Sequence, residues 1–126
     1  MKIEILQCDI PNKNGRSYST EMIKNQLEEI NQNNKQILGY YNNNTGNLVD
    51  VAFIAKDLKV DENGFLISNT VQILETPMGI LLKKDLAQGF NIKFNISGKG
   101  DIDKHGNVSN YTLDSITGIA SPEFEI

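Results

Sequence analysis

Hydrophobic residues in this 126-residue chain follow two different periods, and the order in which these periods alternate constrains the fold most strongly. A period of two is typical of β-strands, whereas a spacing of three or four places side chains on one face of a helix. The pattern predicts strands at residues 2 to 10, Gln36 to Tyr41, Leu48 to Val60, Phe65 to Leu74, Phe90 to Ile96 and Val108 to Ile119. It predicts one helix from Ser19 or Thr20 that fades into Asn31 to Asn34, and a second from Pro77 to Gln88.

Turn-forming and capping residues mark the ends of these segments. The run Asp61 to Gly64 resembles a tight hairpin turn in which Asn63 and Gly64 take positive φ angles, so the flanking strands should pair antiparallel. Thr76 followed by Pro77 indicates a helix start, and Gly89 indicates a left-handed helix end. We expect this second helix to bury Met78, Leu81, Leu82 and Leu86.

The resulting order of elements predicts one α+β domain covering residues 1–126. The length suits a single hydrophobic core, since chains divide into domains only when they are larger. A strand, a helix, three strands, a helix and two strands indicate a mostly antiparallel sheet or a small closed barrel with two helices.

Charge and hydropathy argue against two classes of partner. The chain has 12 basic and 16 acidic residues, and no run of lysine or arginine concentrates positive charge. Because nucleic-acid affinity depends largely on neutralising phosphates, we expect no direct nucleic-acid binding. The apolar stretches are far shorter than the roughly 20 residues that span a bilayer, and the first residues lack the apolar core of a signal peptide. We therefore expect a soluble protein made in a cytoplasm, with no membrane partner.

Few residues offer metal or catalytic chemistry. Cys8 is the only cysteine, which excludes an internal disulfide and a multi-cysteine zinc site, and its apolar-periodic segment indicates a buried thiol. His105 is the only histidine and lies in a polar turn, where a surface position is expected. A calcium loop that began at Asp101 would need a carboxylate where Thr112 stands. We expect no metal ion and no cofactor.

The segment Ser97 to Gly100, Ser-Gly-Lys-Gly, has the composition of a phosphate-binding loop. It lacks the spacing of a P-loop and the Lys-Ser/Thr ending that such a loop needs for its phosphates and magnesium ion. We therefore interpret it as a glycine-rich turn between strands.

Four phrases, taken in order, resemble the prohead maturation proteases of tailed bacteriophages, whose serine-protease fold is related to that of herpesvirus assemblins. Asn12 to Tyr18, followed by a helix, resembles the opening Asn-x-Asn-Gly-Arg-x-Tyr of that family, and Ile73 to Gly79 resembles its Ile-Leu-x-Thr-Pro-x-Gly helix entry. Gly89 to Gly100 resembles the strand that ends in Ser-Ser-Arg-Gly-x-Gly, and Ile116 to Pro122 resembles the closing strand. The resemblance covers nearly the whole chain and implies a prohead-protease-like fold.

The same resemblance implies that the catalytic base of the family is missing. Active members carry it in a Gly-Glu-Leu-x-His-Pro phrase, and the corresponding stretch here runs from Gly39 to Asn44. Asn43 stands at the histidine position. Asparagine has no group that titrates near neutral pH, so it cannot take the proton of a serine hydroxyl.

The resemblance also implies that the serine nucleophile of the family is missing from its position. When Gly98 and Gly100 are aligned with the family glycines, Asn95 and Ile96 stand over its serine pair and Ser97 stands over its arginine. The resemblance therefore implies a catalytically inactive descendant and no enzyme activity. In the alternative, an active serine endopeptidase, the nucleophile would be Ser97, with His105 or an acidic residue as its partner.

These comparisons of motifs lead to one main functional hypothesis. We expect a non-enzymatic virion protein, an auxiliary or decoration component of the capsid that binds the major capsid protein or other head proteins, is oligomeric in the virion and assembles in the host cytoplasm. The first alternative is an active prohead maturation protease that cleaves capsid or scaffold precursors. The second alternative is an internal scaffold-core protein.

Aromatic and apolar residues supply the candidate contacts with such a partner. Tyr40, Tyr41, Phe94 and Phe124 are large side chains that lose little entropy at an interface, although for each of them a place in the core is the more common role. Phe124 and Ile126 alternate with glutamates at the end of the sequence, so this end either pairs with a neighbouring molecule or completes its own sheet.

Overall fold

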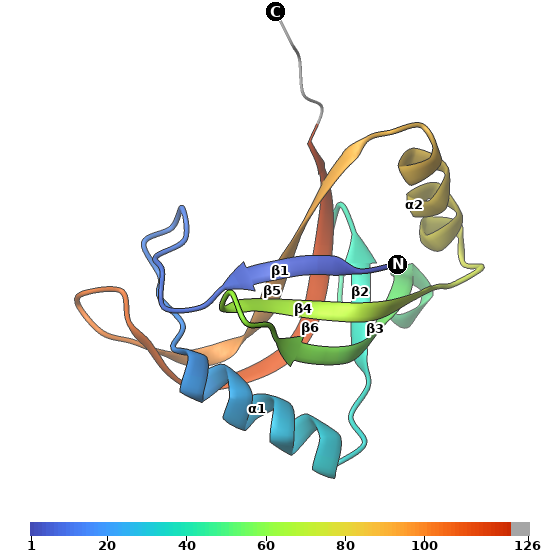
Figure 1. Cartoon of the computed structure of the whole chain (residues 1–126). Coiled ribbons are helices and arrows are strands. Elements are labelled where there is room, and N and C mark those ends of the chain that lie inside the picture. Colours follow the sequence, from blue (N-terminus) through green and yellow to red (C-terminus); the bar gives the residue numbers. More distant parts are fainter. Residues whose placement is uncertain (122–126) are drawn as a thin grey trace, which may run out of the picture.

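Six strands and two helices make up the fold in the computed structural model, which describes residues 1–121 (Figure 1). In chain order the elements are β1 (Ile3–Gln7), α1 (Thr20–Gln32), β2 (Ile37–Tyr41), the short 3₁₀ helix η1 (Leu48–Asp50), β3 (Val51–Val60), β4 (Phe65–Ile73), α2 (Pro77–Ala87), β5 (Asn91–Ile102) and β6 (Val108–Ser121).

The strands form one sheet in the order β1-β4-β3-β2-β6-β5. All neighbours are antiparallel except β2 and β6, which run parallel. The two edge strands, β1 and β5, also approach each other, so the sheet is nearly closed into a barrel (Figure 1). The predicted α+β class, with a mostly antiparallel sheet and two helices, is confirmed.

One hydrophobic core joins all of these elements. Phe53, Leu66, Leu82 and Ile116 are completely buried, and they come from β3, β4, α2 and β6. The remaining strands and α1 contribute further side chains to the same cluster. Cys8 belongs to this core as a buried free thiol, and burial raises its pKa, which keeps it protonated.

Helix α1 is a surface helix with one buried face. Ser19 caps it by accepting a hydrogen bond from the backbone N–H of Met22 at 3.2 Å. Ile23, Leu27 and Ile30 recur at spacings of four and three and are buried, whereas the charged residues lie on the exposed face. This periodicity is visible in the sequence, and the helix that it predicted is confirmed.

Helix α2 begins and ends where the sequence indicates, but it buries less than expected. Thr76 caps it by accepting from the N–H of Gly79 at 3.1 Å, and Gly89 has a φ of 83° just beyond its end. Leu82 is fully buried and Met78 and Leu86 are partly buried. Leu81 is 37% exposed, so its predicted burial is wrong. The helix meets the sheet along a single narrow face.

Two local predictions on the chain between β2 and β4 were also wrong. The strand predicted from Leu48 begins only at Val51, because Asn47 accepts a hydrogen bond from the N–H of Val49 and starts the 3₁₀ turn η1. In the hairpin turn Gly64 has a positive φ, whereas Asn63 has not. The side chain of Asp61 accepts from the N–H groups of Asn63 and Phe65 and holds a longer turn than the predicted one.

The segment Ser97 to Gly100 is not a turn between strands, as predicted, because it lies inside β5. Here β5 pairs with β6 on both sides of the glycines. A glycine-rich segment suggests a turn when composition alone is considered. In this strand, however, the glycines allow close contact with β6.

Candidate functional site

Strand β5 places the residues aligned with the family nucleophile on two different faces. Ile96 packs against the core on the same face as Phe94, so Asn95 and Ser97 lie on the outer face of the sheet. Asn95 is the partner of Thr117 on β6, and Ser97 is the partner of Ser115. Ile96 thus contributes to the packing of the core, whereas Asn95 and Ser97 lie on the outer face.

A β-bulge directly follows Ser97. The pairing of β5 with β6 shifts between Ser97 and Gly98, because Ser97 is opposite Ser115 whereas Gly98 is opposite Leu113. The extra residue of the bulge is Asp114, whose carboxylate lies 3.7 Å from the ammonium group of Lys35. Bulges are common beside functional sites, where they reorient side chains, and this one lies next to Ser97.

The two glycines after Ser97 are explained by close packing. A Cβ on Gly98 would lie against the backbone oxygen of Thr112 and the phenol of Tyr111. A Cβ on Gly100 would lie 3.2 Å from the Tyr111 ring. The Gly-x-Gly phrase therefore makes room for Tyr111, whose ring is edge-on to that of Tyr18 with centroids 5.2 Å apart.

Asn43 lies in the loop of residues 42–47, which reaches over the same outer face. Asn43 itself is exposed. The loop is anchored by its neighbours, since the N–H of Asn42 donates to the carbonyl of Gly118 at 2.7 Å and the Asn44 amide donates to the Ser115 hydroxyl at 3.0 Å. Ser115 is also the partner of Ser97, so the loop and β5 meet through this one serine.

His105 lies at the tip of the β5–β6 hairpin. The Asp103 carboxylate holds this turn by accepting from the N–H groups of Asn107 and His105, and these hydrogen bonds lower its pKa. Ile102 lies five positions beyond Ser97 on β5, a distance of about 17 Å along the strand, and His105 lies beyond Ile102. The structure therefore does not bring Ser97 and His105 together.

A groove of about 350 Å³ opens beside Ser97 at the free end of the hairpin. Its polar groups are the hydroxyls of Ser97, Tyr18 and Tyr111 and the cations of Arg16 and Lys99. Among the described residues that line the groove there is no carboxylate and no imidazole. Burial raises the pKa of Tyr111, so its phenol stays protonated at neutral pH. These groups can bind a polar or anionic group, but none of them is a ready base for Ser97.

Sequence reasoning had not identified Ser115, Asn44 or Lys99 as neighbours of Ser97. The contact with Ser115 depends on the bulge at Asp114, and no local sequence signal marks a bulge. The position of Lys99 beside Arg16 depends on how the loop before α1 meets the hairpin.

The aromatic residues proposed as partner contacts lie in the interior where the structure describes them. Tyr40, Tyr41 and Phe94 are each at most 8% exposed. The Tyr41 hydroxyl donates to the Asp85 carboxylate of α2 at 2.6 Å, and burial together with this carboxylate raises its pKa. These three residues therefore pack in the core and leave little surface for contact with a partner. Phe124 and Ile126 lie outside the described residues.

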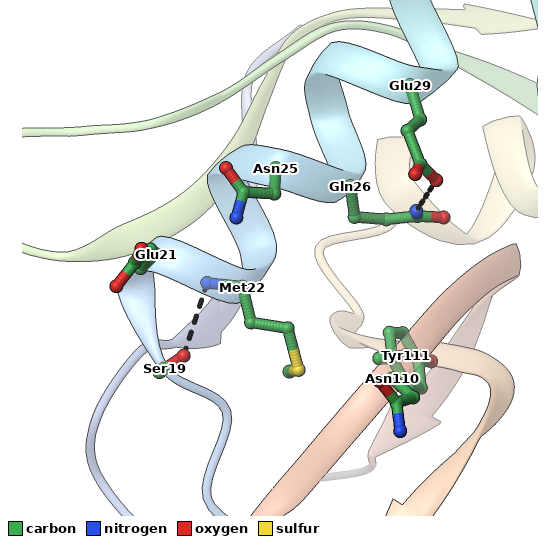
Figure 2. A pocket seen from close by; sticks show the side chains of 8 residues that line it. All are labelled: Ser19, Glu21, Met22, Asn25, Gln26, Glu29, Asn110 and Tyr111. Carbon is green, nitrogen blue, oxygen red and sulfur yellow. Dashed lines mark hydrogen bonds between the residues drawn. The ribbon is translucent and has the colours of Figure 1, made fainter.

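A second pocket, of about 340 Å³, lies between α1 and β6. Figure 2 shows Met22 extending from the helix toward Tyr111 of the strand. The polar groups are partly used within the protein, since Ser19 caps α1 and the Gln26 amide donates to the Glu29 carboxylate at 2.9 Å (Figure 2). Among the residues of 1–121 that line this pocket, no nucleophile is hydrogen-bonded to a base.

Metal-binding clusters and membrane-spanning helices are both absent from residues 1–121. This part of the chain contains no group of three or more histidine, cysteine or acidic side chains arranged to hold a metal ion. None of its helices is long and apolar enough to cross a membrane.

Comparison with known proteins identifies the architecture. No protein-family model matches the sequence, and no curated protein matches it either. Among solved structures, the capsid assembly protease gp21 of bacteriophage T4 matches with a TM-score of 0.79, over 97% of this chain and 82% of that chain. The fold is that of a capsid assembly protease. The two sequences are 20% identical, so the comparison establishes the shared fold and leaves activity to be judged from the site.

Proposed function

We propose that this protein is a non-enzymatic structural component of a phage head, in which the fold of a capsid assembly protease serves as a binding module. The observation that carries this proposal is the groove beside Ser97, whose described lining holds hydroxyls and cations but no carboxylate or imidazole. A serine hydroxyl without an adjacent base is a poor nucleophile. The fold itself supports a setting in the phage head, because it is shared with a capsid assembly protease.

Its partners on this proposal are the major capsid protein or other head proteins. A maturation protease has to recognise these chains before it cleaves them, and an extended segment can be recognised by its backbone and side chains without any chemistry. Loss of catalysis leaves such a docking surface intact. We further propose that several copies assemble in the virion, as an auxiliary or decoration component.

The alternative, an active protease, is favoured by one observation. Ser97 is only partly buried, directly precedes a bulge and opens onto a groove. Its neighbour across the bulge, Asp114, carries a carboxylate, although this carboxylate is paired with Lys35. The proposal and this alternative make opposite predictions for the reactivity of Ser97.

The test is to incubate the purified protein with capsid precursor and, separately, with a serine-reactive phosphonate. We expect no cleavage and no labelling, and we expect Ser97→Ala to behave like the wild type in both assays. Labelling at Ser97, or cleavage that disappears in Ser97→Ala, would show an active protease and overturn the proposal.

Mass spectrometry of full heads tests the structural role. An intact chain in fixed proportion to the major capsid protein is the expected result. A chain present in empty precursors but absent from full heads would identify an internal scaffold-core protein instead.

A further inference from the structure

Helix α2 has more apolar surface than the rest of the domain covers. Ile80 is 58% exposed and Leu81 is 37% exposed, while Leu82 is fully buried. A helix with apolar residues on most of its circumference is normally covered on more than one side. Helix α1 makes the contrast clear, because its apolar residues are confined to the face that packs on the sheet. The outer side of α2 is therefore an apolar surface that this domain leaves open.

This surface borders a groove of about 710 Å³, which is larger than the two pockets described above. The end of β4 and the residues after it supply the apolar floor, and α2 supplies one wall with Gly79, Ile80 and Ala87. The floor residues are Val71, Ile73 and Leu74. Figure 1 shows α2 at one end of the sheet, well away from α1 and from the β5–β6 hairpin tip. The groove is thus separate from the groove beside Ser97.

The wall of this α2–β4 groove is held in place by backbone contacts. A Cβ on Gly79 would clash with the carbonyl oxygen of Leu74, so the first turn of the helix rests directly on the chain below it. The Thr76 hydroxyl donates to the carbonyl of Val51 at 2.6 Å and fixes the same turn to β3. A site that is already shaped before binding loses little conformational entropy when it is filled.

The rim of the groove is basic. Lys83 and Lys84 border it together with a single acidic residue, Glu75. Within residues 1–121 neither lysine forms an ion pair, and the acidic residue beside them, Asp85, accepts the Tyr41 hydroxyl instead. A locally positive rim on a chain whose net charge is −4 favours a ligand with carboxylates.

We propose that the α2–β4 groove docks a short segment of a partner protein in which apolar side chains are flanked by acidic ones. The apolar side chains fill the floor beside Ile80, and the acidic ones pair with Lys83 and Lys84. This docking proposal rests on the proposed function in one respect: the partner that the groove would hold is taken to be a protein of the phage head. It does not depend on whether Ser97 is reactive.

The experiment pans a display library of random heptapeptides against the full, immobilised chain and measures the binding of enriched peptides by fluorescence anisotropy. We expect enriched peptides to combine apolar residues with Asp or Glu. Ile80→Asp should weaken their binding roughly tenfold or more, as expected for an apolar residue at the centre of a contact. Lys83→Glu should weaken it several-fold and reduce its dependence on salt.

Matched controls separate the groove from general effects. Leu48→Asp changes a leucine that is 73% exposed and lies outside the groove, so binding should be unchanged. Because Ile80 is exposed, Ile80→Asp should unfold at the same temperature as the wild type, which excludes misfolding as the cause of weaker binding.

Three results would overturn the docking proposal. The first is an enriched set without acidic residues, and the second is binding that Ile80→Asp leaves intact. The third is a dimer of the wild type in solution that Ile80→Asp dissociates, because the groove would then be covered by a second copy of this chain. Labelling of Ser97 by the phosphonate would overturn the proposed function and leave the result of the peptide assay unaffected.

Discussion

At the scale of single residues, the closest packing in the candidate site is found at two glycines of β5, Gly98 and Gly100. Gly98 faces the backbone oxygen of Thr112, which cannot move without disturbing the pairing of β5 with β6. We predict that Gly98→Ala lowers the free energy of unfolding by about 3 kcal/mol, the upper part of the usual range for overpacking. Urea denaturation measures this change, and Lys99→Ala, at the exposed next position, should change stability by less than about 0.5 kcal/mol. Equal effects of the two substitutions would contradict the packing argument.

Asp103 gives a prediction about pH. Hydrogen bonds from the N–H groups of Asn107 and His105 lower its pKa below the ordinary value of 3.8. A carboxyl whose pKa is lower in the folded than in the unfolded state stabilises the fold above the ordinary value, and the effect is lost as the pH falls through the lowered pKa. The stability advantage of the wild type over Asp103→Asn should therefore be constant near neutral pH and decline below about pH 4. Urea titrations across this range measure the difference, and an advantage that grows toward acid pH would refute the assignment.

Residue identity alone indicated some of these features and concealed others. Asn43 and Ser97 were singled out through the resemblance to the prohead proteases, because Asn43 stands at the histidine position of that family and Ser97 lies beside its serine positions. Their connection through Asn44 and Ser115 was not predictable, since it depends on how the loop of residues 42–47 folds against β6. The burial of Tyr40 was equally hidden, because an aromatic residue suits a core and an interface alike.

At the scale of elements, α1 is fastened to β6 by side chains that complete the edge of a strand. The Gln26 side chain is buried and accepts from the N–H of Leu113 at 2.8 Å, and the Lys35 ammonium donates to the carbonyl of Leu113 at 2.6 Å. These two bonds satisfy backbone groups on the side of β6 that faces away from β5, where β2 pairs only with Ser115 to Gly118 and does not reach Leu113. Helix and sheet are therefore joined by specific polar contacts as well as by the core.

We predict that Gln26→Ala lowers the free energy of unfolding by about 1 to 3 kcal/mol, because the N–H of Leu113 would remain buried without an acceptor. The neighbouring Asn25→Ala removes an exposed amide on the same helix and serves as the control. Hydrogen exchange should show faster exchange at Leu113 in Gln26→Ala alone. Matching stabilities of the two variants would show that the hydrogen bond does not matter.

The elements were predictable from the sequence where periodicity and capping agreed. α1 has both, with Ser19 at its start and buried residues at helical spacing. The start of β3 was misplaced because Leu48 and Val49 continue the apolar pattern, while the hydrogen bond from the Val49 N–H to Asn47 turns the chain there. The exposure of Leu81 was missed because α2 is apolar on most sides, and such a helix gives no periodicity from which a buried face can be read.

At the scale of the whole molecule, the parallel pairing of β2 with β6 determines the architecture. These strands are far apart in the sequence, and their pairing joins the β5–β6 hairpin to the sheet formed by the other strands. No hairpin turn links β2 to β6. The sequence therefore predicted the strands and their mostly antiparallel arrangement, but not the parallel pairing of β2 with β6. The pairing also brings the loop of residues 42–47 over Ser115, so the candidate site exists only in the complete fold.

A single core that includes side chains from both helices and all six strands has a consequence for unfolding. We predict that the chain unfolds in one cooperative transition, with the same midpoint by far-ultraviolet and near-ultraviolet circular dichroism. Phe53→Ala should lower the free energy of unfolding by about 3 to 5 kcal/mol, because Phe53 is fully buried and edge-on to Phe94 at 5.6 Å. Both probes should shift together in this variant, since Phe94 belongs to β5 and Phe53 to β3. Separate midpoints for the two probes would mean that the β5–β6 hairpin unfolds apart from the remaining sheet, and residues 1–121 would then contain two stability units in place of one.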